Sequence, residues 1–335
     1  MTAMAARSSS LRPVAAALLL AVAAAAPLAL AGAPASAQTS APCGAQTLAT
    51  LTAIDSAVAT NIYRGELGSS ETHIDLNHVV TTPELISAVA ADDATATLAA
   101  VKRIVYHPFW HIVRLRVYDA AGRLLADVGG PYVIAPVEGT LESNGKAIGS
   151  FVMSVQDDLG FAKLETRSVD DPIGIYLDGA LVMDRGASFP RRQPAAATLT
   201  LDGVTYSPAT LTYEAFPSGT LQAVIAVPLP STAESAQSCS AVTLAETVRI
   251  VKRLAARFHP LAARYSDFVT TVHADTGAVV IVRIGLRVIA GSGGPGPSLL
   301  PAAGAISYEG REWSVYSFTP TPPATVYVLV AQPAS

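Results

Sequence analysis

The stretch from His107 to Tyr132 reads HPFWHIVRLRVYDAAGRLLADVGGPY, and it marks the point where the chain changes from helical to strand periodicity. Over residues 110–119, successive side chains fall on opposite faces of an extended strand. One face carries His111, Val113, Leu115 and Val117, and the other carries Trp110, Ile112, Arg114, Arg116 and Tyr118. The DAAG at 119–122 predicts a turn, and residues 123–128 predict a returning strand. The stretch therefore predicts a β-hairpin.

Two helices are predicted before this hairpin. The first covers residues 47–63, where apolar side chains keep a helical period at Leu48, Leu51, Ile54, Val58 and Ile62. The second covers residues 83–105 and has Pro83 in its first turn. It ends at His107, because the residue before a proline avoids helical geometry.

Strand patterns continue after the hairpin. They cover residues 147–157, 161–167 and 173–177, with turns predicted at residues 157–160 and 171–172. Helices that precede a largely antiparallel sheet indicate the α+β class.

Short sequence matches in the same order indicate an internal duplication. The matched pairs are CGAQTLAT (43–50) with CSAVTLAE (239–246), VKRIVYHP (101–108) with VKRLAARFHP (251–260), VYDAAGRLLADV (117–128) with VHADTGAVVIVR (272–283), and LDGVTY (201–206) with YEGREW (308–313). We therefore predict two related α+β modules, a larger one over residues 38–232 and a smaller one over residues 233–335. The linker-like VPLPSTAESAQSC, residues 227–239, lies at their junction.

The first residues have the features of a secretory signal peptide. Arg7 and Arg12 precede an apolar stretch rich in alanine and leucine, and residues 35–37, ASA, match a cleavage site. We therefore expect cleavage after Ala37 and secretion of the mature chain. We predict no membrane span in that chain, because no second apolar stretch of sufficient length follows.

The composition excludes some classes of partner. Residues 1–37 contain two of the 22 Lys and Arg residues and none of the 26 acidic residues, so the remaining 298 residues have a net charge near −6. This balance argues against nucleic acid as a partner. Half of the residues are apolar and 14% are charged, which is typical of a folded globular chain.

The chain has two cysteines, Cys43 and Cys239. In an exported protein an even number of cysteines favours a disulfide, and two cysteines allow one intramolecular pairing. Free or intermolecular thiols are the alternative.

The segment HPFWHIVRLRVYDAAGRLLADVGGPYVIAPVEGTL with GSFVMSVQDD resembles the PDC/Cache-like domains, which are PAS-like extracellular sensors, of exported actinobacterial proteins. The resemblance covers mainly residues 83–180. It implies N-terminal helices packed on an antiparallel PAS/Cache-like sheet, followed here by the smaller related module. The tyrosine, arginine and tryptophan signature of amino-acid-binding Cache domains is not recognisable, so no ligand is carried over from it.

The histidines offer weak candidates for a metal site. His107 and His111 have a helical metal spacing, but Pro108 separates them and the chain is turning into a strand. We expect His107 at a helix end and His111 on the apolar strand face. A second group, His73, Asp75 and His78, is attributed to a polar surface loop. We predict no metal and no cofactor.

No complete catalytic motif is present. A G-x-S-x-G elbow and a Walker loop are both missing from the sequence, and the GSGGPGP at 291–297 has no following lysine. We therefore expect a protein without enzymatic activity. Asp157 and Asp158 are attributed to a turn, with calcium or a cationic ligand as the alternative.

The remaining candidate is the polar face of the hairpin. Arg114 and Arg116 share it with Trp110 and Tyr118, and two fixed guanidinium groups can hold a carboxylate or phosphate. Asp127 and Tyr132 flank the following loop and would close one end of a pocket. Two alternatives stay open: this face lines a ligand pocket, or it is an ordinary solvated side of a sheet.

We therefore predict a secreted sensor-like protein that binds a small metabolite, with an anionic one favoured, and that presents it to a separate protein partner. The alternative is a structural or surface-interaction protein without a ligand pocket.

Overall fold

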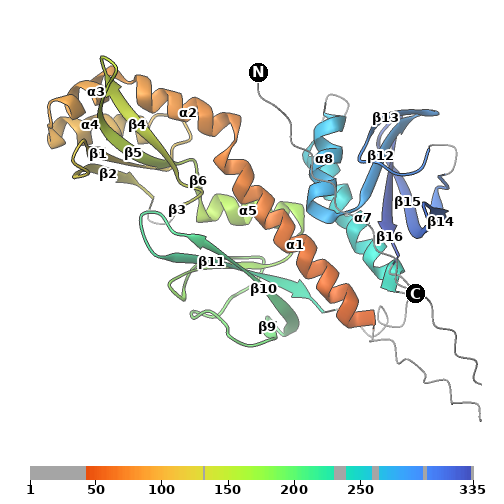
Figure 1. Cartoon of the computed structure of the whole chain (residues 1–335). Helices are drawn as coiled ribbons and strands as arrows, with labels where there is room; N and C mark the ends of the chain where they lie inside the picture. The colour runs from red at the N-terminus through yellow and green to blue at the C-terminus, as the bar shows by residue number, and fades with distance from the viewer. Residues whose placement is uncertain (1–42, 131–132, 230–238, 259–263, 297–299, 333–335) are drawn as a thin grey trace, which may run out of the picture. The chain divides into compact units, whose positions relative to one another are not determined.

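The computed structural model describes residues 43–130, 133–229, 239–258, 264–296 and 300–332, all within one compact unit, Ser40–Ser335 (Figure 1). This part of the chain contains three antiparallel sheets with four or five strands each, which we call the first, second and third sheet in chain order. Helices precede each of them. The predicted α+β class is confirmed. The predicted module boundary lies within residues 230–238, outside the described residues.

The first sheet has the strand order β2-β1-β5-β4. Its strands are β1 (Arg114–Asp119), β2 (Leu124–Gly129), β4 (Val137–Ser143) and β5 (Lys146–Ser154). One face packs on the helices α2 (Ser70–Thr81), α3 (Pro83–Ala90) and α4 (Ala94–Val105). The apolar core between them includes Leu85, Val101, Ile104, Leu115, Phe151 and Met153. The predicted hairpin is confirmed as β1 and β2, and its alternation buries Leu115 and Val117 against the helices.

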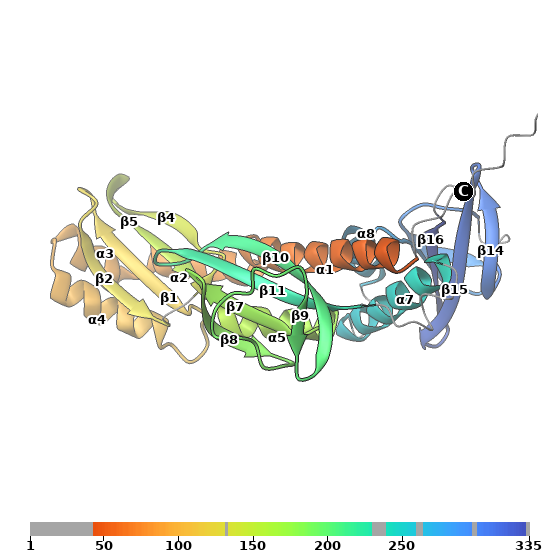
Figure 2. The same cartoon turned by 90° about the horizontal axis from the view of Figure 1, so that it is seen from below.

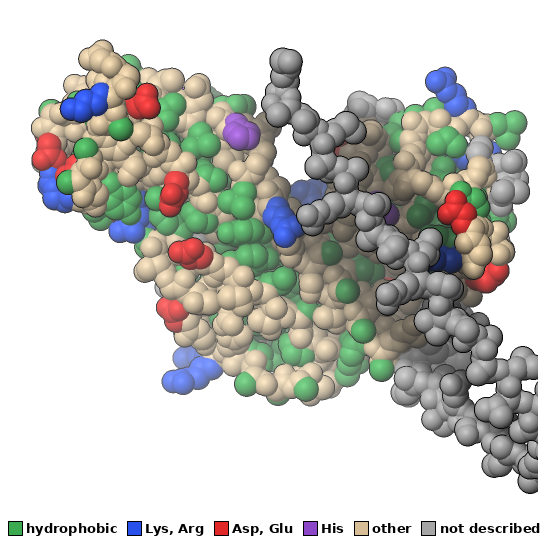
Figure 3. All heavy atoms as spheres, viewed as in Figure 1, with side chains coloured by type: hydrophobic (Ala, Val, Ile, Leu, Met, Phe, Trp, Pro, Cys, Tyr) green, Lys and Arg blue, Asp and Glu red, His purple; other side chains and the backbone are tan. Residues whose placement is uncertain are grey.

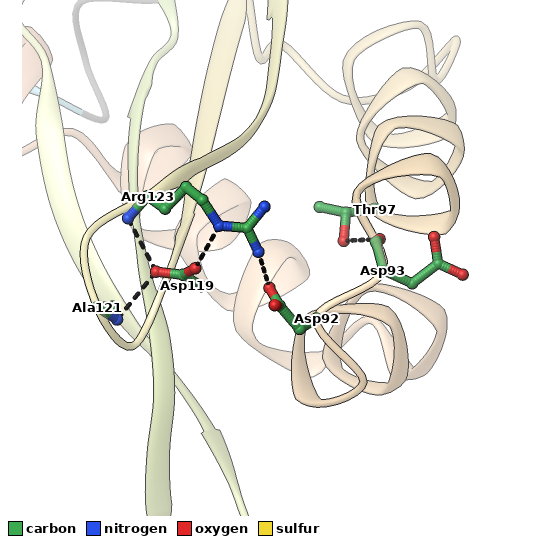
Figure 4. Close-up of polar contacts among 6 residues, drawn as sticks. All are labelled: Asp92, Asp93, Thr97, Asp119, Ala121 and Arg123. Atoms are coloured by element: carbon green, nitrogen blue, oxygen red, sulfur yellow. Dashed lines mark hydrogen bonds and ion pairs between the residues drawn. The ribbon is translucent and has the colours of Figure 1, made fainter.

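The turn of this hairpin is held by its own first residue (Figure 4). Asp119 Oδ1 accepts hydrogen bonds from the backbone N–H groups of Ala121 at 2.9 Å and Arg123 at 2.8 Å. The Arg123 guanidinium contacts Asp119 and also Asp92, which lies between α3 and α4. A polar contact thus links the hairpin turn to the helical layer.

The single helix predicted over residues 83–105 is wrong, because the chain breaks it into α3 and α4. Asp92 has a positive φ of 56°, and the Asp93 side chain caps α4 by accepting from the Ala96 backbone N–H at 2.9 Å. The attribution of residues 73–78 to a loop is also wrong, since they lie in α2. Ser69 caps that helix.

The strand predicted over residues 161–167 is instead the helix α5 (Asp158–Ser168). Asp157 caps it by accepting from the Gly160 backbone N–H at 2.6 Å, so the acidic pair belongs to a helix start. The buried residues Phe161, Ala162, Glu165 and Ser168 follow a helical period. Just before α5, β6 (Gln156–Asp157) pairs with β3 (Val133–Ile134) in a small separate ladder.

The second sheet has the order β8-β7-β11-β10-β9. Its strands are β7 (Ile173–Leu177), β8 (Ala180–Arg185), β9 (Leu199–Leu201), β10 (Val204–Glu214) and β11 (Thr220–Pro228). The strand predicted at residues 173–177 is confirmed as β7. The segment predicted as the larger module therefore contains two sheets, and in each of them the first strand lies between the second strand and the last strand of that sheet.

The third sheet belongs to the smaller module and has the order β13-β12-β16-β15-β14. Two helices precede it, α7 (Cys239–Arg257) and α8 (Tyr265–Thr276). Its strands are β12 (Val279–Ile284), β13 (Arg287–Gly291), β14 (Ala303–Tyr308), β15 (Arg311–Thr321) and β16 (Ala324–Ala331). Numbered from its first strand, this sheet repeats the full order of the second sheet, 2-1-5-4-3.

The first helix, α1 (Cys43–Leu67), lies in a core that the second and third sheets share. It runs beside β10 and α8, as Figure 2 shows. The shared core takes Val58 from α1, Phe161 from α5, Leu254 from α7, Phe268 from α8, and strand residues such as Ile225 and Val280. Helices α1, α5, α7 and α8 therefore join the two sheets through one apolar layer. No helix in the described part of the chain combines the length and hydropathy needed to cross a membrane.

The matched segments at the two ends of the predicted repeat lie at equivalent positions of the fold, whereas one middle match does not. Both cysteines begin long helices, α1 and α7, and LDGVTY and YEGREW both form the turn between the third and fourth strands of a sheet. The two turn residues have positive φ in both hairpins, 49° and 84° at 202–203 and 51° and 72° at 309–310, which explains the shared glycine. In contrast, 117–128 is the β1–β2 hairpin whereas 272–283 joins α8 to β12.

Candidate functional site

Four of the predicted site residues come together on the face of the first sheet that is turned away from its helices. Asp127 of β2 lies opposite Arg116 of β1 in the strand register. Asp127 accepts from Arg114 at both carboxylate oxygens, from Nε and from Nη2, each at 2.8 Å. Arg116 Nε lies 3.1 Å from Asp127 Oδ2. One carboxylate therefore organises both guanidinium groups, and we call Arg114, Arg116, Tyr118 and Asp127 the arginine face.

Backbone geometry fixes Arg114 further. Its Nη1 donates to the Gly130 carbonyl oxygen at 2.7 Å. A side chain on Gly129 would collide with the Val113 carbonyl oxygen, 2.2 Å from the position of its Cβ, so glycine is required where β2 leaves the sheet. The Arg114 guanidinium also lies 5.7 Å from the centre of the Phe216 ring, which comes from the turn before β11. Arg114 is thus held from three sides.

The charges of the four residues that form the arginine face do not balance. Two guanidinium groups meet one carboxylate, and their side chains are 13%, 22% and 22% exposed for Arg114, Arg116 and Asp127. The Arg116 guanidinium also lies 5.7 Å from the centre of the Tyr118 ring. A cluster with one surplus positive charge, partly removed from water, can hold an anionic group more strongly than an exposed arginine can.

The other two predicted site residues are not part of this face. Trp110 precedes β1, and its ring stacks between His78 and His107, with centroid distances of 4.3 Å and 4.1 Å. It packs against the core of the first sheet and its helices, so the strand alternation does not extend back to it. Tyr132 lies outside the described residues. The side chains of Cys43 and Cys239 also lie outside them, and the disulfide stays a prediction.

The histidine predictions have mixed outcomes. His107 follows the end of α4, as predicted. His111 is not on the buried strand face: its side chain is 67% exposed and contacts Glu71, while its backbone N–H donates to Asp75 Oδ2 at 3.1 Å. These residues line a groove of about 240 Å³ beside α2. Among the described residues, no three His, Cys, Asp or Glu side chains are arranged to hold a metal ion.

Sequence reasoning missed a group of buried acids in the shared core. Asp55 of α1 is 1% exposed, and burial together with the neighbouring Asp171 and Glu165 raises its pKa from 3.8 to about 9. Its carboxyl group hydrogen-bonds to Asp171, whose pKa burial raises to about 6. Burial also raises the pKa of Glu165 well above its ordinary value. Asp55 and Asp171 line a cavity of about 40 Å³ with Arg249, which is too small for a metabolite.

A larger cleft lies between α1 and α8, and it was also missed. Its volume is about 490 Å³, and its polar lining includes Asn61, Glu66, Arg257 and Asp275. Asn61 Nδ2 donates to Asp275 Oδ1 at 2.7 Å across 214 positions of sequence. No local motif marks these residues, because helix packing alone brings them together.

No family model matches the chain, and no curated protein matches it. Among solved structures, it is similar to the periplasmic domain of LuxQ from Vibrio cholerae, with 11% identity and a TM-score of 0.33, covering 55% of this chain and 99% of that one.

Two further solved structures are also similar to the chain at low sequence identity. An extracellular ligand-binding receptor from Desulfohalobium retbaense is 12% identical, with a TM-score of 0.24, covering 55% of this chain and 39% of that one. The ligand-binding domain of the Pseudomonas aeruginosa amino acid chemoreceptor PctC, in complex with GABA, is 11% identical, with a TM-score of 0.21, covering 50% of this chain and 99% of that one. Two of these three structures are named for ligand binding.

Proposed function

We propose that this chain is a secreted, non-enzymatic, sensor-like protein that binds a small anionic metabolite on the arginine face of its first sheet. Residues 1–37 would direct its export, and a separate protein partner would receive the signal. The observation that carries the proposal is the surplus positive charge that Asp127 organises on a partly buried sheet face.

The two arginines have different roles in this proposal. Arg114 is a positioning residue, because Asp127 and the Gly130 carbonyl already occupy its Nε, Nη1 and Nη2. Arg116 contacts Asp127 through Nε, which leaves its terminal amino groups to donate to a ligand carboxylate or phosphate. Hydrogen bonds to charged groups contribute about 1.5–3 kcal/mol each, so a bidentate contact can dominate the affinity of a small ligand.

The neighbouring side chains favour a polar ligand of small size. Across the register from Arg116 lie Val152 of β5 and then Glu138 of β4, and Ser150 lies beside Tyr118. Glu138 and Ser150 are exposed. The anion would therefore sit near Arg116, with hydroxyl or amino groups of the ligand directed toward the β4 side.

Acidic and basic side chains are both scattered over the described surface in the view of Figure 3, without one dominant sign. Attraction of an anion would thus come from the fixed arginine pair and its local geometry. This distinguishes the proposed site from a broad electrostatic surface.

A thermal-shift screen of small carboxylates and phosphates tests the proposal. A ligand at about 100 times its Kd stabilises the folded state by about 2.7 kcal/mol, which is readily detected. We expect a shift with the wild type that is lost in Arg116→Gln. Arg103→Gln, at an exposed position of α4, is the matched control and keeps the shift. A shift that survives in Arg116→Gln, or the lack of any shift across the panel, contradicts the proposal.

A surface-interaction protein is the second candidate, and one observation favours it. Ile74, Tyr106 and Phe109 are 57%, 71% and 83% exposed near α2 and the end of α4. Ile74 and Phe109 line the same groove, and exposed apolar side chains close together are typical of protein contact sites. If the screen finds no ligand while a Phe109→Ser variant loses a partner that the wild type retains, this second function replaces the first.

A further inference from the structure

The cleft between α1 and α8 is chemically unlike the arginine face. It is lined by acceptor groups from both helices and by two arginines, Arg257 at the end of α7 and Arg264 just before α8. The acceptors that matter here are Asn61, Glu66, Thr271 and Asp275, and the arginine that acts on the two acids is Arg257.

The floor of the cleft carries a buried carboxylate. Asp275 is 4% exposed, and burial raises its pKa from 3.8 to about 6, while the Asn61 hydrogen bond and Arg257 lower it in part. Glu66 of α1 is partly buried, and its pKa is raised by burial and lowered by Arg257. Burial therefore disfavours the charged form of both acids, and the ammonium group of a ligand held between them would favour it.

The positive charge of Arg257 lies at the exposed side of the cleft. Arg257 is exposed, and it acts electrostatically on both Glu66 and Asp275. A purely cationic ligand would be repelled by Arg257, and a purely anionic ligand would be repelled by the two acids. A molecule that carries one positive and one negative charge can pair with the two acids and with Arg257.

We propose that this cleft binds a small zwitterion, with its ammonium group on Asp275 and Glu66 and its anionic group on Arg257. Asn61 fixes the Asp275 carboxylate, and Thr271 adds a hydroxyl acceptor. The cleft is separate from the arginine face, so this proposal does not depend on the proposed function.

The position of the cleft gives such binding a structural consequence. Helix α1 packs on the second sheet and α8 packs on the third, and both contribute to the shared core. A ligand held between Glu66 of α1 and Asp275 of α8 favours the arrangement in which these two helices are close. Binding would therefore stabilise the association of the smaller module with α1.

Isothermal titration calorimetry with a matched set of probes tests this proposal. Glycine, β-alanine and 6-aminohexanoate vary the separation of the two charges. Propylamine and propionate carry only one charge each, in the size of β-alanine. We expect at least one zwitterion to bind, and its Kd to be about tenfold or more lower than that of either singly charged probe.

Three variants locate the site. Asp275→Asn and Arg257→Gln are each expected to weaken zwitterion binding by about tenfold or more, and Arg287→Gln, exposed on β13, to leave it unchanged. Glu66→Gln, at a partly buried position, serves if Asp275→Asn fails to fold. Binding of no zwitterion, equal binding of propylamine, or binding unchanged in both Asp275→Asn and Arg257→Gln overturns the proposal.

Discussion

Replacing Asp55 with asparagine removes the carboxyl group that burial perturbs most clearly in the shared core. In the folded chain the pKa of Asp55 is raised from 3.8 to about 9, first by burial and then by Asp171 and Glu165, with Arg249 acting in the opposite direction. The folded chain therefore keeps a proton that the unfolded chain releases. Asparagine has the same shape, can still donate a hydrogen bond to Asp171, and does not titrate.

The size of the effect follows from this proton. Stability that is present below pH 3.8 is lost as the pH rises toward about 9, because the unfolded chain binds fewer protons than the folded chain. The loss is about 1.4 kcal/mol for each pH unit, or about 2.7 kcal/mol between about pH 6.5 and pH 8.5. Glu165 is present in both proteins, so the difference between them reports Asp55 together with its coupling to Asp171.

Urea unfolding at about pH 6.5, 7.5 and 8.5 measures this difference. We expect the free energy of unfolding to fall less steeply with pH in Asp55→Asn than in the wild type, and Asp55→Asn to be the more stable protein at the highest pH. Glu142→Gln, at an exposed position of β4, keeps the wild-type slope. Equal slopes in wild type and Asp55→Asn would refute the assignment of a buried, protonated Asp55.

Three further predictions concern the stability of the folded chain and its predicted disulfide. Trp110→Ala should lower the free energy of unfolding by about 3 kcal/mol in urea titrations. The Trp110 ring is stacked between His78 and His107 and packs on the core between the first sheet and its helices. Gly129→Ala should destabilise the chain by more than about 2 kcal/mol, whereas Gly130→Ala, whose nearest contact would be 3.9 Å away, should be close to neutral in the same assay. If Cys43 and Cys239 form the predicted disulfide, intact-mass spectrometry of the secreted protein should show a mass lower by two hydrogens than that of the reduced chain, and an equal mass contradicts the pairing.

The hairpin turns and the class of fold could be predicted from local signals. The period of two across β1, the DAAG turn and the D-G or E-G pairs at 202–203 and 309–310 act through a few neighbouring residues, so the sequence displays them. The helix α5 was wrongly predicted as a strand, because its local signals are incomplete. Its apolar pattern is interrupted by the buried Glu165, and the capping role of Asp157 is visible only once the backbone turns.

The candidate site was predictable only in part. Arg114 and Arg116 share a face because they are two positions apart in one strand, and Asp127 joins them through the predicted hairpin register. The contact of Arg114 with Phe216 crosses more than a hundred positions, as does that of Asn61 with Asp275. Such contacts depend on how helices and sheets pack, which a single sequence does not display.

The most direct measurement of the central claim is the identification of small molecules released from the protein purified after secretion by its own cells. Mass spectrometry of the material released on denaturation would compare the wild type with Arg116→Gln, using Arg103→Gln as the control. The arginine face predicts a small carboxylate or phosphate compound that is released from the wild type and from Arg103→Gln and that is missing from Arg116→Gln. Release of the same compounds from all three proteins, or of none from the wild type, would contradict it.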